Sequence, residues 1–143
     1  DLHIHDLDFM VYAFGMPKVK YQYRSKLPDQ DFISLSYDFG DFTVNSEASW
    51  YATCYPFTAE FRFQFEDALV SNENGKMVIY LRDDKKIDLS QDAEGDTGSI
   101  NLPKSDAYAN EIHYFADCVV NNKPVDKVKP EELRCVLNIL NSL

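Results

Sequence analysis

The chain has 143 residues, of which 45% are hydrophobic and 27% charged, and its formal net charge at pH 7 is -10. This length suits one domain with a single core, and the composition is that of a folded globular protein. The acidic charge argues against nucleic acid and anionic lipid as partners, because both require clustered Lys and Arg. No apolar run approaches the roughly twenty residues of a membrane-spanning helix, and the first residues lack the basic and apolar regions of a signal peptide, so we expect no membrane association. Three cysteines without a CxxC pair leave at least one thiol unpaired, which indicates a reducing cytoplasm.

A helix is the first predicted element. Apolar side chains recur at helical spacing in residues 1–14, at Ile4, Leu7, Val11 and Phe14. Gly15 and Pro17 then end the pattern in the usual order, so we expect the helix to end at about Phe14.

Strands follow, because apolar and polar residues alternate. The predicted strands cover residues 19–24, 32–39, a run that reaches 51, 57–65, 68–71 and 76–82. Val19, Tyr21 and Tyr23 are expected on one face of the first strand. A row of Phe61, Phe63 and Phe65 is expected to give one side to the core. We expect one meander of five or six antiparallel strands, followed by a polar segment over 83–105 with at most a short strand at 87–89.

Two helices are predicted at the end of the chain. Asp106 is expected to cap the first, whose apolar residues recur from Ala109 to Val119, and Pro130 suits the first turn of the second. The predicted fold is α+β: an open, mainly antiparallel sheet with helices packed on one face, forming a single domain over residues 1–143.

The opening DLHIHDLDF concentrates polar residues and raises the question of a metal site. Asp-x-His-x-His is similar to the metal-binding strand of amidohydrolase-like and PHP-type phosphoesterase barrels, where His3 and His5 would share one face. Such barrels need about 250 residues and further ligands. This chain has only one other histidine, His113, in a predicted helix. We therefore expect no metal site.

On a helix the same letters group differently. Asp1, His5 and Asp8 fall on one stripe, and His3 points almost the opposite way. A carboxylate four residues before a histidine can hydrogen-bond its ring and fix its tautomer, as in a positioned acid-base group. Alternatively, the acidic residues are ordinary ones near a helix start and His5 is a satisfied interfacial residue. Spacing alone leaves both interpretations open.

Three elements of the chain occur in an order that is typical of one known family: Asp-x-x-x-His-x-x-Asp on a helix that ends in Gly and Pro, a Ser-Trp element, and a Tyr-x-x-Glu-x-x-x-Phe helix. The residues of these elements are Asp1, His5, Asp8, Gly15, Pro17, Ser49, Trp50, Tyr108, Glu111 and Phe115. In these elements the chain resembles the C-terminal domain of the Gfo/Idh/MocA oxidoreductases. The resemblance covers essentially the whole chain.

The resemblance implies the substrate domain of an NAD- or NADP-dependent oxidoreductase that acts on a sugar, cyclitol or related polyol. His5 would exchange a proton with the substrate hydroxyl while hydride passes to or from nicotinamide, and Asp1 would orient His5. His3, Asp8 and Trp50 are candidate substrate contacts. Many family members have a small residue at the position of His3, and a packing role is favoured for His3 because it is predicted to point away from His5. Asp8 equally suits a structural role.

The resemblance also implies parts that this sequence lacks. No Gly-x-Gly-x-x-Gly turn and no Glu-Lys-Pro segment with the family's catalytic lysine is present. We therefore expect the N-terminal Rossmann domain to lie outside this chain, and the chain alone neither to bind NAD(P) tightly nor to turn over. A homodimer or homotetramer formed through the sheet is expected. The alternative function is a non-catalytic ligand-binding or oligomerisation module of the same fold.

Overall fold

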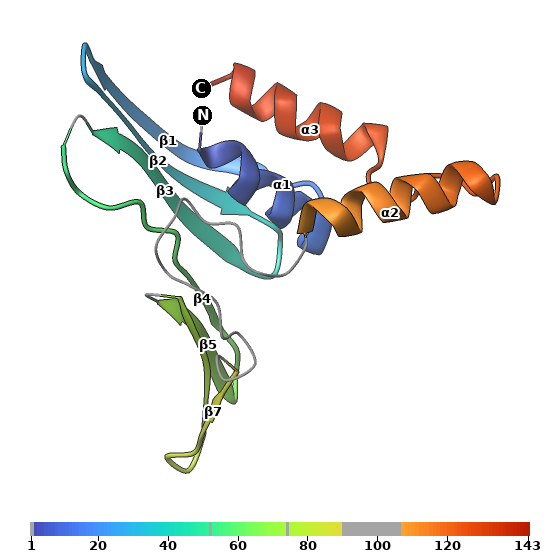
Figure 1. The fold of residues 1–143 in the computed structure, drawn as a ribbon. Helices are drawn as coiled ribbons and strands as arrows, with labels where there is room; N and C mark the ends of the chain where they lie inside the picture. The colour runs from blue at the N-terminus through green and yellow to red at the C-terminus, as the bar shows by residue number, and fades with distance from the viewer. Residues whose placement is uncertain (1, 52, 74, 90–106) are drawn as a thin grey trace. The chain divides into compact units, whose positions relative to one another are not determined.

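The computed structural model describes residues 2–51, 53–73, 75–89 and 107–143 (Figure 1). The elements in chain order are α1 (His3–Phe14), β1 (Lys18–Leu27), β2 (Gln30–Asp38), β3 (Thr43–Tyr51), β4 (Phe61–Gln64), β5 (Ala68–Glu73), β6 (Lys76–Leu81), β7 (Lys86–Asp88), α2 (Ala107–Val120) and α3 (Pro130–Asn141). They form two compact units: Asp1–Tyr55 with Asn122–Leu143, and Pro56–Asn121.

Helices and open antiparallel sheets confirm the predicted α+β class. The strands divide, however, between a three-stranded sheet of order β1-β2-β3 and a four-stranded sheet of order β4-β5-β6-β7. The prediction of a single meander was therefore wrong. Pro56 lies between β3 and β4 and has no N–H to donate to a ladder, which favours a break in the sheet there. The assignment of residues 1–143 to one domain stays a prediction.

In the first unit, α1 and α3 pack on one face of the three-stranded sheet (Figure 1). Leu7, Met10 and Val11 form the buried stripe of α1 at spacings of three and four residues. They meet Leu35 and Tyr37, which alternate on β2, and Val136 of α3. This cluster holds α1 against the sheet and so fixes which side of the helix remains exposed.

Glycines allow two tight connections in this unit. Gly15 has a φ of +87°, and its N–H donates to the Val11 carbonyl at 2.9 Å, which ends α1. Gly40 has a φ of +93° in the turn from β2 to β3, where its N–H donates to Asp38 Oδ1 at 2.9 Å. A side chain at either position would be strained, because L-residues rarely adopt such angles.

A β-bulge changes which residues of β1 face the helices. Val19 pairs with Tyr37, whereas the next pair is Tyr21 with Ser36, so Lys20 is the extra residue. One extra residue moves every later side chain to the opposite face of the strand. The prediction that Val19, Tyr21 and Tyr23 share a face was therefore wrong. Tyr21 and Tyr23 lie on the outer face, and Arg24 lies on the helix-covered face.

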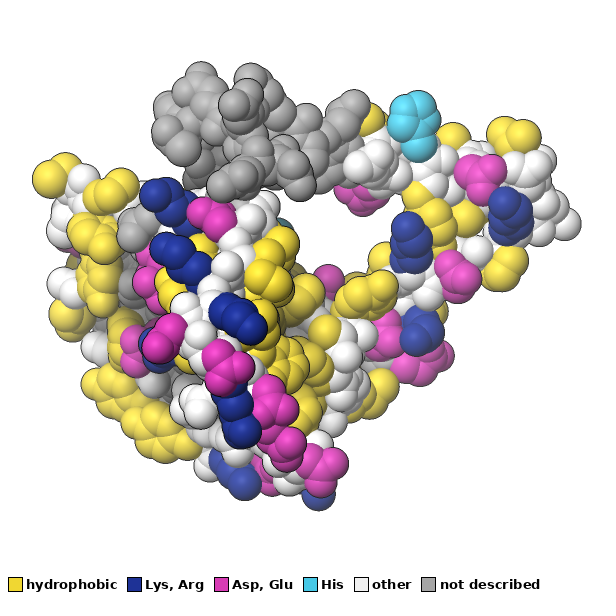
Figure 2. All heavy atoms as spheres, turned by 90° about the horizontal axis from the view of Figure 1, so that it is seen from below, with side chains coloured by type: hydrophobic (Ala, Val, Ile, Leu, Met, Phe, Trp, Pro, Cys, Tyr) yellow, Lys and Arg dark blue, Asp and Glu magenta, His cyan; other side chains and the backbone are white. Residues whose placement is uncertain are grey.

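The second unit contains β4–β7 and α2. Phe61 and Phe65 are exposed and Phe63 is half-buried, so the phenylalanine row expected to face the core is mainly open to solvent. Figure 2 shows hydrophobic side chains on the surface among interspersed acidic and basic ones. On α2, the apolar side chains at helical spacing are likewise exposed. They are Tyr108, Ile112, Phe115 and Val119. The predicted cap, Asp106, lies outside the described residues.

Two expectations about the environment of the protein can be compared with the structure. Among the described helices, none combines the length and apolar character needed to cross a bilayer. No disulfide joins the three cysteines, all of which are among the described residues: Cys118 is buried, Cys135 is half-buried and Cys54 is exposed.

Candidate functional site

Helix α1 separates the two histidines of the opening motif. His3 is only 3% exposed and faces the sheet, whereas His5 and Asp8 lie on the exposed side of the helix. The burial of His3 agrees with the packing role favoured for it, and that role stays a prediction. The predicted partner of His5, Asp1, lies outside the described residues. The helix thus presents His5 and Asp8 outward and leaves His3 for the interior.

His3 is the centre of a buried polar network. Its Nε2 lies 2.6 Å from the Tyr37 hydroxyl oxygen, and its Nδ1 lies 3.3 Å from Ser46 Oγ. The Asp6 carboxylate is 3.6 Å from the same Nδ1. The rings of His3 and Tyr37 are also stacked, with centroids 5.8 Å apart. The network joins the first turn of α1 to β2 and β3.

The surroundings favour one arrangement of protons in this network. Burial, together with the negative charge of Asp6, raises the pKa of Tyr37 well above its usual value, so the hydroxyl stays protonated. A carboxylate near Nδ1 favours a proton on that nitrogen. We therefore assign the tautomer in which Nδ1 carries the hydrogen and Nε2 accepts the Tyr37 O–H. No buried side-chain nitrogen or oxygen of the described residues is left without a partner.

This network makes a first prediction. Tyr37→Phe removes the only hydroxyl within hydrogen-bond distance of His3 Nε2 among the described residues and leaves that nitrogen buried and unsatisfied. We expect the free energy of unfolding to fall by about 1–3 kcal/mol. Urea denaturation followed by Trp50 fluorescence measures this, because Trp50 is the only tryptophan of the chain and lies in the first unit.

Tyr23→Phe is the matched control for this measurement. Tyr23 is a tyrosine of the neighbouring strand β1 whose side chain is 51% exposed. Its hydroxyl is accessible to water, so its removal should change the free energy of unfolding by less than about 0.5 kcal/mol. Equal losses in the two variants would contradict a specific hydrogen bond between His3 and Tyr37.

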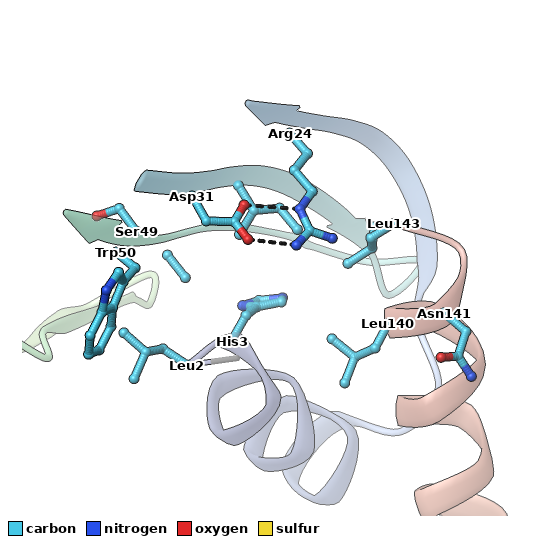
Figure 3. Close-up of a pocket in the computed structure, with 11 residues that line it drawn as sticks. Leu2, His3, Arg24, Asp31, Ser49, Trp50, Leu140, Asn141 and Leu143 are labelled. Atoms are coloured by element: carbon cyan, nitrogen blue, oxygen red, sulfur yellow. Dashed lines mark hydrogen bonds and ion pairs between the residues drawn. The ribbon is translucent and has the colours of Figure 1, made fainter. Parts of the chain in front are cut away.

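Beside His3 the first unit has an open cavity of about 340 Å³, which we call the Trp50 cleft. Its lining comes from the start of α1, all three strands of the sheet and the end of α3. These residues are Leu2, His3, Arg24, Asp31, Ile33, Ala48, Ser49, Trp50, Leu140, Asn141 and Leu143. Figure 3 shows Trp50 and Leu2 at one end of the cleft and Leu140, Asn141 and Leu143 at the other, with His3 between them.

An ion pair forms the sheet side of the cleft. Arg24 Nε donates to Asp31 Oδ1 at 3.0 Å, and Nη2 donates to Oδ2 at 2.6 Å (Figure 3). These hydrogen bonds hold the pKa of the Asp31 carboxyl below its usual value. Both side chains remain over one-third exposed, so the pair contributes little to stability but orients the guanidinium group.

The cleft brings together some predicted site residues and leaves out others. His3 and Trp50, two of the candidate substrate contacts, line it, whereas His5 and Asp8 do not. Arg24 and Asp31 also line the cleft, but they were not predicted as site residues from the sequence. The sequence does contain a signal for this ion pair. Pro28 and Asp29 separate Leu27 from its partner Gln30, and the resulting strand register puts Arg24 and Asp31 diagonally opposite each other.

Neither a metal nor a dinucleotide site is evident in the described part of the chain. No group of three or more His, Cys, Asp or Glu side chains gathers there with the geometry of a metal site. Gly15, Gly40 and Gly75 occupy three separate turns, so these glycines do not form the glycine-rich strand-to-helix turn that holds a dinucleotide.

Comparison with known proteins adds no relative. No protein-family model, no curated protein and no solved structure gives a significant match to this chain. The similarity to the Gfo/Idh/MocA oxidoreductases therefore stays a prediction that depends on the motif residues, and the function is proposed from those residues and the geometry around them.

Proposed function

We propose that this chain is the substrate domain of an NAD(P)-dependent oxidoreductase that acts on a hydroxyl carbon of a sugar, cyclitol or related polyol. The exposed position of His5 on a helix whose opposite side is buried carries this proposal. An acid-base group must be accessible to its substrate, and the exposed side of α1 meets this requirement for His5.

The proposed chemistry assigns a proton transfer to His5. When bound, a nicotinamide cofactor supplies the hydride acceptor. As the substrate carbon gains carbonyl character, its hydroxyl proton must leave, and a neutral imidazole at His5 accepts it. Asp1 is four residues earlier in the sequence, at the spacing from which a carboxylate can orient the ring. Asp8, one turn beyond His5 on the exposed side, is proposed to contact the substrate or to steady the start of the helix.

The rigidity of α1 supports this role. Its buried stripe is fixed to the sheet by Leu7 and Val11, and its first turn is fixed by the hydrogen bond between His3 and Tyr37. Catalytic groups act best from elements whose own positions are held by packing and by further hydrogen bonds. His5 follows His3 by two residues, so its position depends on both restraints.

The proposal extends to assembly and location. Tyr21, Tyr23 and Tyr51 are exposed on the face of the first sheet away from the helices, and exposed aromatic faces often mark subunit contacts. We propose a homodimer or homotetramer that uses this face, and a cytoplasmic location, which the lack of disulfides among the three cysteines supports.

Hydride transfer tests the proposed function. The intact protein, including the dinucleotide-binding domain that we expect outside this chain, is incubated with NAD or NADP and a panel of sugars and cyclitols. We expect reduced nicotinamide to form with at least one of them, measured by its absorbance. The 143-residue chain alone serves as the control and should show no turnover.

Two results would argue against the proposal. If no sugar or cyclitol supports nicotinamide reduction by the intact protein, the chain is better described as a non-catalytic ligand-binding or oligomerisation module. If the isolated chain binds NADH at micromolar concentration in a fluorescence titration, the cofactor site does not lie outside this chain as proposed.

A further inference from the structure

The Trp50 cleft has the size and lining of a small-molecule site. Its volume of about 340 Å³ lies at the lower end of the range typical of ligand pockets, roughly 300–1,000 Å³. Such pockets combine apolar walls with a few polar groups that orient the ligand. His5 and Asp8 do not line the cleft, so a ligand here would lie apart from the proposed acid-base group.

Arg24 has hydrogen-bonding capacity that the structure leaves unused. A guanidinium group carries five N–H donors in a planar fork. Asp31 occupies the edge formed by Nε and Nη2. Among the described residues, no hydrogen bond is recorded on the second edge, which Nη1 forms with the other Nη2 hydrogen. That edge matches the two oxygens of a carboxylate.

The charges near this edge favour an anion. Lys26 pairs with Asp31 in the strand register and therefore lies on the same face of the sheet as Arg24 and Asp31. Two cationic side chains thus stand against one carboxylate at this end of the sheet. Asp31 also holds the guanidinium in place, so little side-chain freedom would be lost when a second acceptor binds.

Apolar side chains stand at both ends of the cleft, whose remaining lining also includes the polar residues His3, Ser49 and Asn141. Trp50 is 66% exposed although it lines the cavity, so its indole ring is available to a ligand. Leu2 lies beside it, and Leu140 and Leu143 line the opposite end (Figure 3). Exposed tryptophan offers a large, rigid contact area for an apolar or aromatic ring.

We propose that the Trp50 cleft binds a small carboxylate with an apolar body. The carboxylate accepts two hydrogen bonds from the open edge of Arg24, which faces the Leu140 and Leu143 end of the cleft (Figure 3), and the apolar body extends from there along the cleft toward Trp50. A neutral polyol fits less well, because it cannot form a charge-assisted pair with Arg24, and the one carboxylate of the lining, Asp31, already pairs with that residue.

Fluorescence of Trp50 tests this proposal directly, because it is the only tryptophan of the chain. The chain is titrated with cyclohexanecarboxylate, with the neutral cyclohexanecarboxamide and with acetate, which lacks the apolar body. We expect a saturable change with cyclohexanecarboxylate. The carboxamide and acetate should each bind on the order of ten- to a hundredfold more weakly, as loss of a charge-assisted hydrogen-bond pair or of the apolar contact implies.

Variants at Arg24 locate the carboxylate. Arg24→Gln should weaken cyclohexanecarboxylate binding on the order of ten- to a hundredfold, and Arg24→Lys should restore only part of it, because Lys keeps the charge but not the fork. Lys20→Gln is the matched control: it removes a basic residue of the same strand that pairs with Asp38, outside the cleft. Circular dichroism confirms that each variant is folded.

Three outcomes would overturn the proposal. One is equal binding of cyclohexanecarboxylate and its amide. Another is unchanged carboxylate binding in folded Arg24→Gln, and the third is saturable binding of a neutral cyclitol with no response to cyclohexanecarboxylate. The titration needs no nicotinamide and no turnover, so its result does not depend on the proposed function.

Discussion

We expect His5→Ala in the intact protein to lower turnover by about two to four powers of ten, the usual contribution of a positioned acid-base group. The substitution removes the imidazole that would accept the hydroxyl proton, but His5 is exposed and contributes little to the core. The loss should therefore appear in kcat, with the melting temperature unchanged. Steady-state kinetics with a polyol that reduces the cofactor measure it.

His113→Ala is the matched control, because His113 is also an exposed helical histidine and lies in α2, outside the motif. Its turnover should equal that of the unmodified protein. If His5→Ala is as active as His113→Ala, the acid-base role is wrong and the alternative of a non-catalytic module gains support. Asp1→Asn should give a smaller loss than His5→Ala, since Asp1 would act only by orienting the imidazole.

The sequence was most informative about single elements. Alternation of apolar and polar residues identified the strands β2 and β3, and helical spacing identified α1 and two of its three buried hydrophobic positions, Leu7 and Val11. Phe14 was expected in the same stripe but is 38% exposed. It lies at the end of α1 and makes edge contacts with Phe39 and Phe42 instead. The spacing of apolar residues predicts which side of a helix is buried, but not how far along the helix the covering sheet extends.

The face of β1 could not be predicted in the same way. Simple alternation put Arg24 with Lys20 on the solvent side, but the bulge at Lys20 reverses the order from Tyr21 onward. A bulge depends on how the partner strand pairs, and the apolar pattern of β1 alone does not encode that pairing. As a result, the residue that we propose as the carboxylate ligand was assigned to the wrong face.

For α1, the sequence predicted which side each histidine occupies, but not the contacts that His3 makes. The angle of about 100° per residue was enough to separate His3 from His5. The partners of His3 were not predictable, because Tyr37 and Ser46 come from strands 34 and 43 residues later in the sequence. Long-range polar contacts of this kind depend on how the helix docks on the sheet, which the hydrophobic core determines.

The packing of α1 leads to the largest expected effect on stability. Leu7 is fully buried between the sheet and α3, so Leu7→Ala removes apolar contacts and leaves a cavity. We expect the free energy of unfolding to fall by about 2–5 kcal/mol. Urea denaturation followed by Trp50 fluorescence reports unfolding of the first unit, where both residues lie.

Leu137→Ala provides the control for this substitution, because it makes the same change in a helix of the same unit at a side chain that is 51% exposed. Alanine is a strong helix former, so this control should shift the free energy of unfolding by less than about 1 kcal/mol. A comparable loss of unfolding free energy in both variants would mean that Leu7 contributes no more to the core than the exposed Leu137. His5 lies on α1. A large loss of stability in Leu7→Ala, with little loss in Leu137→Ala, would therefore also show that the proposed acid-base group lies on a well-packed helix of the first unit.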